Sequence, residues 1–319
     1  MSTNWPGIIL DFPDPVATWT KIFSTLLETA KGCSSPVTLH DQTVIPDRLL
    51  AEAAWELWSA YPEAACLTSS ALKEWCGLPN PTGRAVLILD ALSLRELPVL
   101  LSGAKARSVS ISRVAVTGAE CPSSTDQFAK SIGAVSRASL ANDNKPASFK
   151  LIDSPLYTDV LSLPFADCAI PPTRNLLLWH TWLDDLIHLQ KRNPDQVATA
   201  TTSTFQSEGF WNFINKLRQG RSLVITSDHG YAVSKLYSSQ VNDPCAEEFL
   251  KETFGASRYV KADGSLPQRF MPPLIMTKNQ QHVVMGQWKW KAQGGFPHIC
   301  HGGMSLLEVA VPWLELPAL

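Results

Sequence analysis

Two short motifs hold the residues of this sequence best suited to bind metal ions. The first, Ser227-Asp228-His229-Gly230, follows the apolar run at 223–225. This run predicts a buried strand, because it is short, aliphatic and β-branched. In open α/β sheets, ligands bind beyond the carboxyl ends of the strands, where this carboxylate and imidazole would stand. The second motif, His301-Gly302-Gly303, lies near the C-terminus. Asp and His together favour zinc or another divalent metal.

Further polar residues follow other predicted elements. Asp90 ends the apolar run 85–90, and Thr125 comes just before a helix-like stretch. Asp184 and His188 are four residues apart, so a helical turn would place both on one face. We therefore expect two sets of three metal ligands. The sets are Asp184, His188 and His301, and Asp90, Asp228 and His229.

These two sets predict a particular chemistry. Each set leaves positions open for substrate or water. Two metals about 3.5–4 Å apart would clamp the attacking and leaving oxygens of an in-line displacement. Thr125 is the expected nucleophile, because metal coordination lowers the pKa of a hydroxyl. Zinc is preferred over manganese, since three of the six ligands are imidazoles.

Simpler alternatives exist for several of these residues. Asp90 and Thr125 each precede a helix-like stretch and are alternatively N-caps. Asp184 and His188 are alternatively a solvated helix face, and Asp185 rivals Asp184 as the ligand.

Three more residues leave the site open to other assignments. Ser93 is a rival nucleophile because it follows Asp90 closely, and His298 is a rival ligand to His301. An enzyme that hydrolyses phosphate monoesters needs an arginine that holds two phosphate oxygens. Arg95 is a candidate for this role on spacing alone. Without such an arginine we favour phosphodiesters as substrates, because their smaller negative charge needs less stabilisation by an arginine.

The order of these motifs resembles the alkaline phosphatase superfamily. Within it, the segment from His301 to Pro312 most resembles the PglZ domain, and the likeness covers about 84–314. The resemblance implies a two-zinc phosphatase or phosphodiesterase with a phosphothreonine intermediate, in a phage-defence or signalling context. The segment Cys121-Pro122-Ser123-Ser124-Thr125 does not fit the Cys/Ser-x-Pro-x-Arg nucleophile of sulfatases, so a sulfatase is not expected.

The composition sets further limits. The chain has 319 residues, a net charge of −2 and 45% hydrophobic residues. This length suits one large α/β domain with a small accessory piece. The near-neutral charge gives no global basic field for nucleic acid. We expect neither a signal peptide nor a membrane span. Seven cysteines without paired spacing favour reduced thiols and a cytoplasmic protein.

Hydrophobic periodicity predicts the architecture. Residues 1–80 read as a helical accessory region, with helices from Pro15 to Gly32, from Asp47 to Ala60 and from Thr68 to Cys76. From 84 to 319, strands alternate with helices, which predicts a mostly parallel sheet with helices on both faces. The resemblance implies that this is the three-layer fold of alkaline phosphatases. Outside the motifs, the expected strands are 109–116, 175–180 and 307–314, with a helix at 210–217, a hairpin at 273–285 and a polar loop at 135–150.

The expected function is therefore hydrolysis of a phosphoester, for which a nucleotide or oligonucleotide is one candidate. The main alternative is a non-catalytic PglZ-type adaptor that binds metal within a larger assembly. The tryptophan-rich N-terminal helices offer a surface for a protein partner. The Trp288-Lys289-Trp290 run is able to stack nucleobases, although a strand with one wet face explains it more simply.

Overall fold

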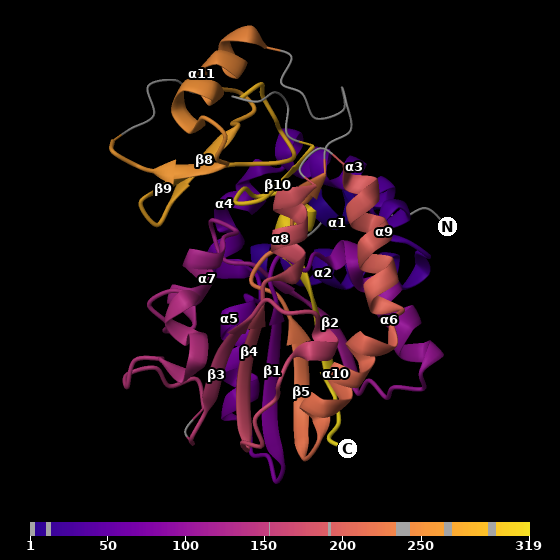
Figure 1. Cartoon of the computed structure of the whole chain (residues 1–319). Helices are drawn as coiled ribbons and strands as arrows, with labels where there is room; N and C mark the ends of the chain where they lie inside the picture. The colour runs from indigo at the N-terminus through magenta and orange to yellow at the C-terminus, as the bar shows by residue number, and fades with distance from the viewer. Residues whose placement is uncertain are drawn as a thin grey trace.

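A six-stranded sheet forms the centre of the computed structural model, which describes residues 4–10, 14–152, 154–190, 193–233, 243–264, 270–292 and 298–319 (Figure 1). Its strands are β1 (Gly83–Leu89), β2 (Arg113–Gly118), β3 (Tyr157–Leu161), β4 (Asn175–His180), β5 (Arg221–Thr226) and β11 (Ala310–Leu316). The order across the sheet is β2-β11-β5-β1-β4-β3. β11 runs antiparallel to both neighbours, and the pairs β5–β1, β1–β4 and β4–β3 are parallel. The predicted mostly parallel sheet is confirmed.

Helices cover both faces of this sheet. On one face, α2 (Pro15–Gly32), α6 (Leu97–Ala106) and α10 (Glu208–Arg218) share a core with alternate strand residues such as Leu87 and Ile225. On the other face, α5 (Thr68–Gly77) and α7 (Thr125–Ser131) pack on the intervening residues, such as Val86 and Val224. The alternation of side chains along a strand therefore produces three layers. The other described helices are α1 (Trp5–Leu10), α3 (Pro36–Ala53), α4 (Trp55–Ala64), α8 (Trp182–Leu189), α9 (Pro194–Phe205), α11 (Pro244–Phe254) and α12 (Leu306–Val309), with short 3-10 turns η1 (Leu94–Glu96), η2 (Ala138–Asp143) and η3 (Phe165–Asp167).

The N-terminal helices are part of the same hydrophobic core. α2 is confirmed in full, because the Asp14 side chain accepts the Val16 N–H at its start and Gly32 ends it. Trp19 of α2 is fully buried in one cluster with Leu87 of β1. The prediction of a single helix from Asp47 to Ala60 is wrong, because the chain leaves helical geometry at Ala54.

The break at Ala54 has a packing reason. It reorients α4 so that the rings of Trp58 and Tyr61 contact Trp19, with centroid distances of 4.9 and 4.8 Å. Such aromatic contacts add to the free energy gained by burying the rings. The helix propensity of the sequence across Ala54 is therefore overridden by tertiary packing.

Three other boundaries differ from the expectation. β2 begins at Arg113, because the N–H of Val109 closes the end of α6 on the carbonyl of Ala104. The expected strand at 307–314 begins as the short helix α12 and becomes β11 only at Ala310. The expected loop at 135–150 contains η2, whose Leu140 is fully buried against the second core.

A small subdomain lies above the carboxyl ends of the strands, at the top of Figure 1. This cap comprises α11, the three-stranded sheet of β7 (Tyr259–Lys261), β9 (Gln281–Val284) and β8 (Ile275–Lys278), and the segment up to Ala292. It has a core of its own, which includes Phe249 and Trp290. The predicted hairpin at 273–285 is confirmed by the antiparallel pair β8–β9.

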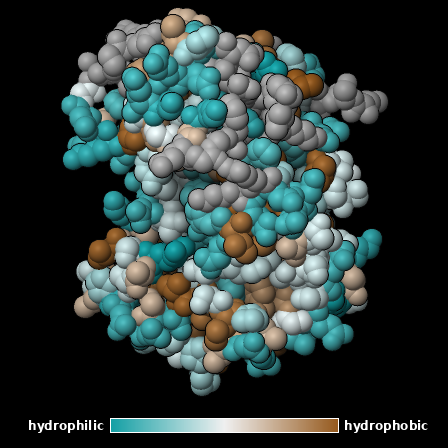
Figure 2. All heavy atoms as spheres, turned by 45° about the horizontal axis from the view of Figure 1, so that its top comes forward, coloured by the Kyte–Doolittle hydropathy of each residue, from teal (hydrophilic) through white to brown (hydrophobic). Residues whose placement is uncertain are grey.

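The surface of the cap differs from that of the body beneath it. In Figure 2, the described part of the cap shows mostly hydrophilic atoms, while hydrophobic atoms are more frequent on the sheet-bearing body. Among the described residues, no helix combines the length and the apolar character that a membrane crossing requires.

The junction between β4 and α8 depends on His180. Its ring is 1% exposed and stacks on Phe165 with a centroid distance of 4.2 Å. Nδ1 accepts the N–H of Trp182 at 3.2 Å, and Nε2 lies 3.0 Å from the carbonyl of Leu163. This pattern requires the neutral ring with its proton on Nε2. His180 is therefore a structural histidine that fixes the start of α8.

Burial of this ring predicts a pH-dependent stability. Burial lowers the pKa of His180 from 6.5 to about 4. Between these values the unfolded chain binds more protons, so wild-type stability falls as the pH drops from 6.5 to 4, by up to about 3 kcal/mol. Urea unfolding of the wild type and His180→Asn across this range measures the difference. We expect the difference in free energy of unfolding between the wild type and His180→Asn to shrink on acidification. A difference that stays constant would contradict a buried, neutral His180.

Candidate metal centre

The predicted site residues meet at the carboxyl ends of the parallel strands. Asp90 follows β1, and Asp228 and His229 follow β5. Asp184 lies in α8, which follows β4. Thr125 is the first residue of α7, which comes after β2. Parallel strands bring residues far apart in the sequence to one edge of a sheet, which is the expected location of a ligand site in this fold class.

His301 reaches the same edge from the opposite direction. β11 is antiparallel, so the residues that precede it, not those that follow it, lie beside the ends of β1 and β5. The short strands β6 (Ala232–Val233) and β10 (Ile299–Cys300) also pair with each other. This pairing brings His301 next to His229, and their rings stack with centroids 4.5 Å apart.

The side chains form two overlapping clusters with metal-ligand spacing. Asp184, His188 and His301 form one, and their ligand atoms lie within 4.8 Å of one another. The second comprises Asp90, Asp184 and His229. Asp184 therefore stands between the two clusters, whereas the sequence placed it in only one set. A carboxylate has two oxygens and can serve two ions at once.

Asp228 lies beside the second cluster. Its Oδ2 is 3.3 Å from Nε2 of His229 and accepts the hydroxyl of Thr125 at 2.9 Å. Its Oδ1 accepts the N–H of Ala91 at 3.1 Å and the hydroxyl of Ser227 at 3.2 Å. One oxygen is thus fixed by the protein and the other faces the site. Asp228 as a metal ligand stays a prediction.

Asp90 is fully buried and strongly constrained. Its Oδ2 accepts the indole N–H of Trp179 at 2.9 Å and pairs with the guanidinium of Arg137. Its Oδ1 lies 3.8 Å from Nε2 of His229. Burial raises the pKa of Asp90 well above its usual value, and the charges of Asp228 and Asp184 raise it further, while Arg137 opposes the rise. Asp90 is therefore no helix cap.

Asp184 has the opposite electrostatic environment. Its Oδ1 is 3.3 Å from Nε2 of His188 and 3.8 Å from Nε2 of His301. Burial alone would raise the pKa of Asp184, but the hydrogen bond from His188 and the imidazoles of His301 and His229 outweigh it and lower the pKa to about 2. The neighbouring Asp185 is exposed and accepts the hydroxyl of Thr181 at 2.6 Å. The geometry thus favours Asp184 over Asp185.

The hydroxyl of Thr125 faces the centre of these groups. Besides Asp228, its Oγ1 lies 3.3 Å from Nε2 of His229 and 3.4 Å from Oδ1 of Asp90. The N-cap of α7 is Ser124, whose Oγ accepts the N–H of Gln127. Thr125 is therefore not occupied by helix capping.

The rival nucleophile Ser93 has a different role. Its side chain is fully buried, and its hydroxyl donates to the carbonyl of Leu307 at 2.8 Å. The same oxygen accepts the N–H of Arg95 at the start of η1. Ser93 therefore links η1 to α12 and does not face the metal-ligand clusters. The other rival, His298, belongs to neither cluster of described residues.

The arginine at the site is Arg137, which the sequence did not single out. It precedes η2, and its side chain is 31% exposed where it pairs with the buried Asp90. Arg95, the candidate by spacing, lies elsewhere, with its guanidinium 5.1 Å from the ring centre of Tyr231. Arg137 belongs to a segment that reads as a polar loop, so only the packing of Leu140 in η2 could have indicated its position.

The donor set fits divalent metal ions. Three carboxylates, from Asp90, Asp184 and Asp228, converge where water is largely excluded, and like charges at such distances repel strongly. Three imidazoles, from His188, His229 and His301, lie among them. Mixed carboxylate and imidazole ligands suit zinc and related ions, and a bound cation would balance the converging negative charge.

Comparisons with known proteins add the following. No family model matches the sequence, and no curated protein sequence matches it. Murine ectonucleotide pyrophosphatase/phosphodiesterase 5 has 13% identity and a TM-score of 0.46, over 74% of this chain and 88% of the murine chain. Phosphonoacetate hydrolase from Sinorhizobium meliloti, solved with phosphonoformate, has 13% identity and a TM-score of 0.46, over 75% of this chain and 90% of its own. The PglZ assignment stays a prediction from the motifs.

The position of Asp184 between the clusters predicts unequal effects of two neighbouring substitutions. Asp184→Asn should lower the zinc content of the protein at both clusters, because it weakens a ligand common to them. Asp185→Asn, the matched control, removes only the charge of an exposed carboxylate that accepts the Thr181 hydroxyl and should leave the zinc content unchanged. Equilibrium dialysis against zinc followed by elemental analysis measures both. Zinc loss in the Asp185 variant alone would show that Asp185, and not Asp184, is the metal ligand.

Proposed function

We propose that this chain is a metal-dependent phosphoester hydrolase with Thr125 as its nucleophile and two divalent ions, preferably zinc, as cofactors. The observation that carries the proposal is the location of the Thr125 hydroxyl. It lies within 3.4 Å of side-chain atoms of Asp90, Asp228 and His229, beside two clusters of metal-type ligands. A hydroxyl among such ligands is what a metal-assisted displacement at phosphorus needs.

The proposed ligands divide between two ions. Asp184, His188 and His301 would hold one, and Asp90, Asp228 and His229 the other, with Asp184 within reach of both. Bound divalent ions would supply positive charge that favours an ionised hydroxyl and neutralises phosphoryl oxygens. His229 is oriented to bind a metal ion through Nε2, since its Nδ1 lies 2.9 Å from the carbonyl of Gly230 and its Nε2 faces Asp228.

The residues of the chain then carry out two displacements. Oγ1 of Thr125 forms a bond to phosphorus while the bond from phosphorus to the leaving alcohol breaks. The hydroxyl proton passes to Oδ2 of Asp228, 2.9 Å away, and from there to the leaving alkoxide, which departs as the alcohol. Water then attacks the phosphothreonine, which releases phosphate or a phosphomonoester and restores the Thr125 hydroxyl.

The charge that Arg137 provides bears on the choice of substrate class. The preference for diesters depended on the absence of a guanidinium at the site, and Arg137 supplies one beside Asp90. A guanidinium forms charge-assisted hydrogen bonds with phosphoryl oxygens. We therefore propose phosphoesters of either class as substrates, with Arg137 holding a non-bridging oxygen. The phage-defence or signalling context is proposed on the PglZ-like motifs alone.

The nucleophile is tested by Thr125→Ala. This variant should keep its fold and its metals but lose hydrolysis of p-nitrophenyl phosphate and bis-p-nitrophenyl phosphate by at least about 1000-fold, because the attacking oxygen is gone. Wild-type turnover should be lost on chelation and return with zinc or manganese. The control is Thr201→Val, which removes a buried hydroxyl within α9.

Two results would argue against this reading. Full hydrolysis by Thr125→Ala would exclude Thr125 as the nucleophile. A folded wild type without metal or turnover, even with added zinc or manganese, would favour the non-catalytic adaptor.

Arg137→Gln tests the contact with phosphate. Loss of one charge-assisted hydrogen bond should lower kcat/KM by roughly 10- to 100-fold. The loss should be larger for the monoester, which carries more negative charge than the diester. Arg113→Gln is the control, because Arg113 pairs with Glu315 on the sheet and is 64% exposed. Equal and small losses for both esters would show that Arg137 does not contact the substrate.

A further inference from the structure

The Gly302-Gly303 turn, next to His301, is held by buried hydrogen bonds from two sides. On one side, Oγ of Ser123 donates to the carbonyl of Gly303 at 2.7 Å and accepts the N–H of Gly302 at 3.2 Å. On the other side, Oε1 of Glu308 accepts the N–H of Gly303 at 3.0 Å. Ser123 and Glu308 are both fully buried. The backbone beside His301 is therefore fixed by side chains that belong to neither metal-ligand cluster.

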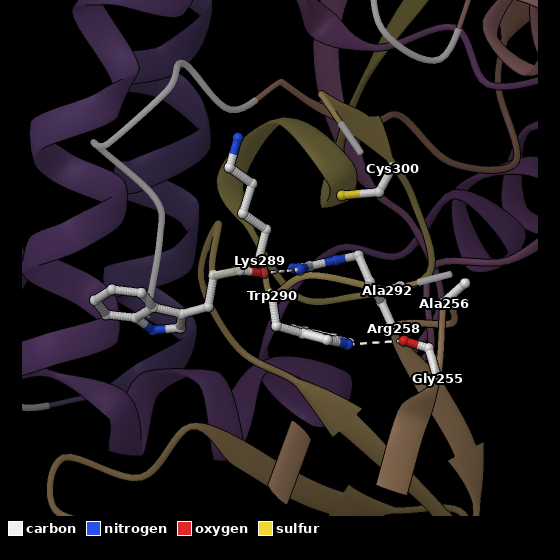
Figure 3. Close-up of a pocket in the computed structure, with 8 residues that line it drawn as sticks. Gly255, Ala256, Arg258, Lys289, Trp290, Ala292 and Cys300 are labelled. Atoms are coloured by element: carbon white, nitrogen blue, oxygen red, sulfur yellow. Dashed lines mark hydrogen bonds between the residues drawn. The ribbon is translucent and has the colours of Figure 1, made fainter. Parts of the chain in front are cut away.

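Glu308 is in turn fixed by the cap. Nε and Nη2 of Arg258 donate to its two carboxylate oxygens at 2.8 and 3.0 Å, in a pair that is almost fully buried. Nη1 of Arg258 donates to the carbonyl of Trp288 at 2.6 Å. Figure 3 shows Arg258 crossing the small pocket beside Trp290, whose indole N–H donates to the carbonyl of Gly255. Residues that line this pocket therefore help to hold the cap in place.

The two glycines leave no free space for side chains. A Cβ atom at Gly303 would lie 2.4 Å from Nη2 of Arg258, and Gly302 has a φ of +100°, which favours glycine. The turn is therefore shaped to fit between Ser123 and Arg258. A change on either side would move the backbone that carries His301.

We infer that Ser123 is a positioning residue that sets His301 relative to Thr125, an inference that rests on the proposed function. Ser123 lies two residues before Thr125 in the same segment, and its hydroxyl bonds the turn directly after His301. One hydroxyl therefore links the segment that carries the proposed nucleophile to the turn that follows a proposed metal ligand. Residues that orient a metal ligand without touching the metal affect both affinity and turnover.

The test is the zinc affinity of Ser123→Ala, measured by competition with a chromophoric chelator. We expect about a 10- to 100-fold weaker affinity at one of the two zinc sites, and an unchanged affinity at the other. Hydrolysis should fall at low zinc and recover at high zinc. Thr201→Val is the matched control for the loss of a buried hydroxyl, and its zinc affinity should equal that of the wild type.

Gly303→Ala tests the same turn from the cap side and serves if Ser123→Ala does not fold. The added methyl group must displace the guanidinium of Arg258, so this variant should also bind zinc more weakly at one site. Gly77→Ala is its control, because a Cβ atom there meets no atom within 4 Å.

The possible outcomes separate the inference from the proposed function. Weaker zinc binding with recovery of hydrolysis at high zinc supports the role of Ser123. Unchanged zinc affinity in both Ser123→Ala and Gly303→Ala, beside a wild type that binds two zinc ions and turns over, would overturn the inference alone. A wild type that binds no zinc would overturn the proposed function, and the inference with it.

Discussion

The structure depends on the convergence of three buried carboxylates at one edge of its sheet. Asp90 and Asp228 are 0% exposed and Asp184 is 8% exposed. Their mutual repulsion in a weakly polarisable environment is unfavourable unless positive charge lies close by. Arg137 and the imidazoles supply part of it, and the arrangement leaves an affinity for cations. The strands that end here, and the helices that pack on them, thus bring together three carboxylates that need positive charge close by.

The one reversed strand of the sheet completes this arrangement. β11 brings its preceding residues, His301 among them, to an edge that the parallel strands reach with their following residues. The motif around His301 therefore has two roles. His301 faces the clusters, whereas Glu308 binds Arg258 of the cap and the N–H of Gly303. Residues that occur together in one motif need not share one chemical task.

The sequence predicted the elements whose pattern is local and missed those that depend on tertiary packing. β1, β4 and β5 each contain a continuous apolar run, and α8 brings Asp184 and His188 together through helical periodicity. α9 was missed because its many threonines have weak helix propensity. Arg137 at the site and Asp184 between two clusters could not be predicted, since both depend on distances between separate elements.

The contacts that build the site also determine when it can form. Ala91 and Asp228 are 137 positions apart, and Ser123 and Gly303 are 180 apart. Closing such long loops costs chain entropy before any contact compensates for it, so these pairings are expected late in folding. A partly folded chain would contain the strands but no assembled centre. Cations that bind only the assembled centre would then draw the folding equilibrium toward the native state.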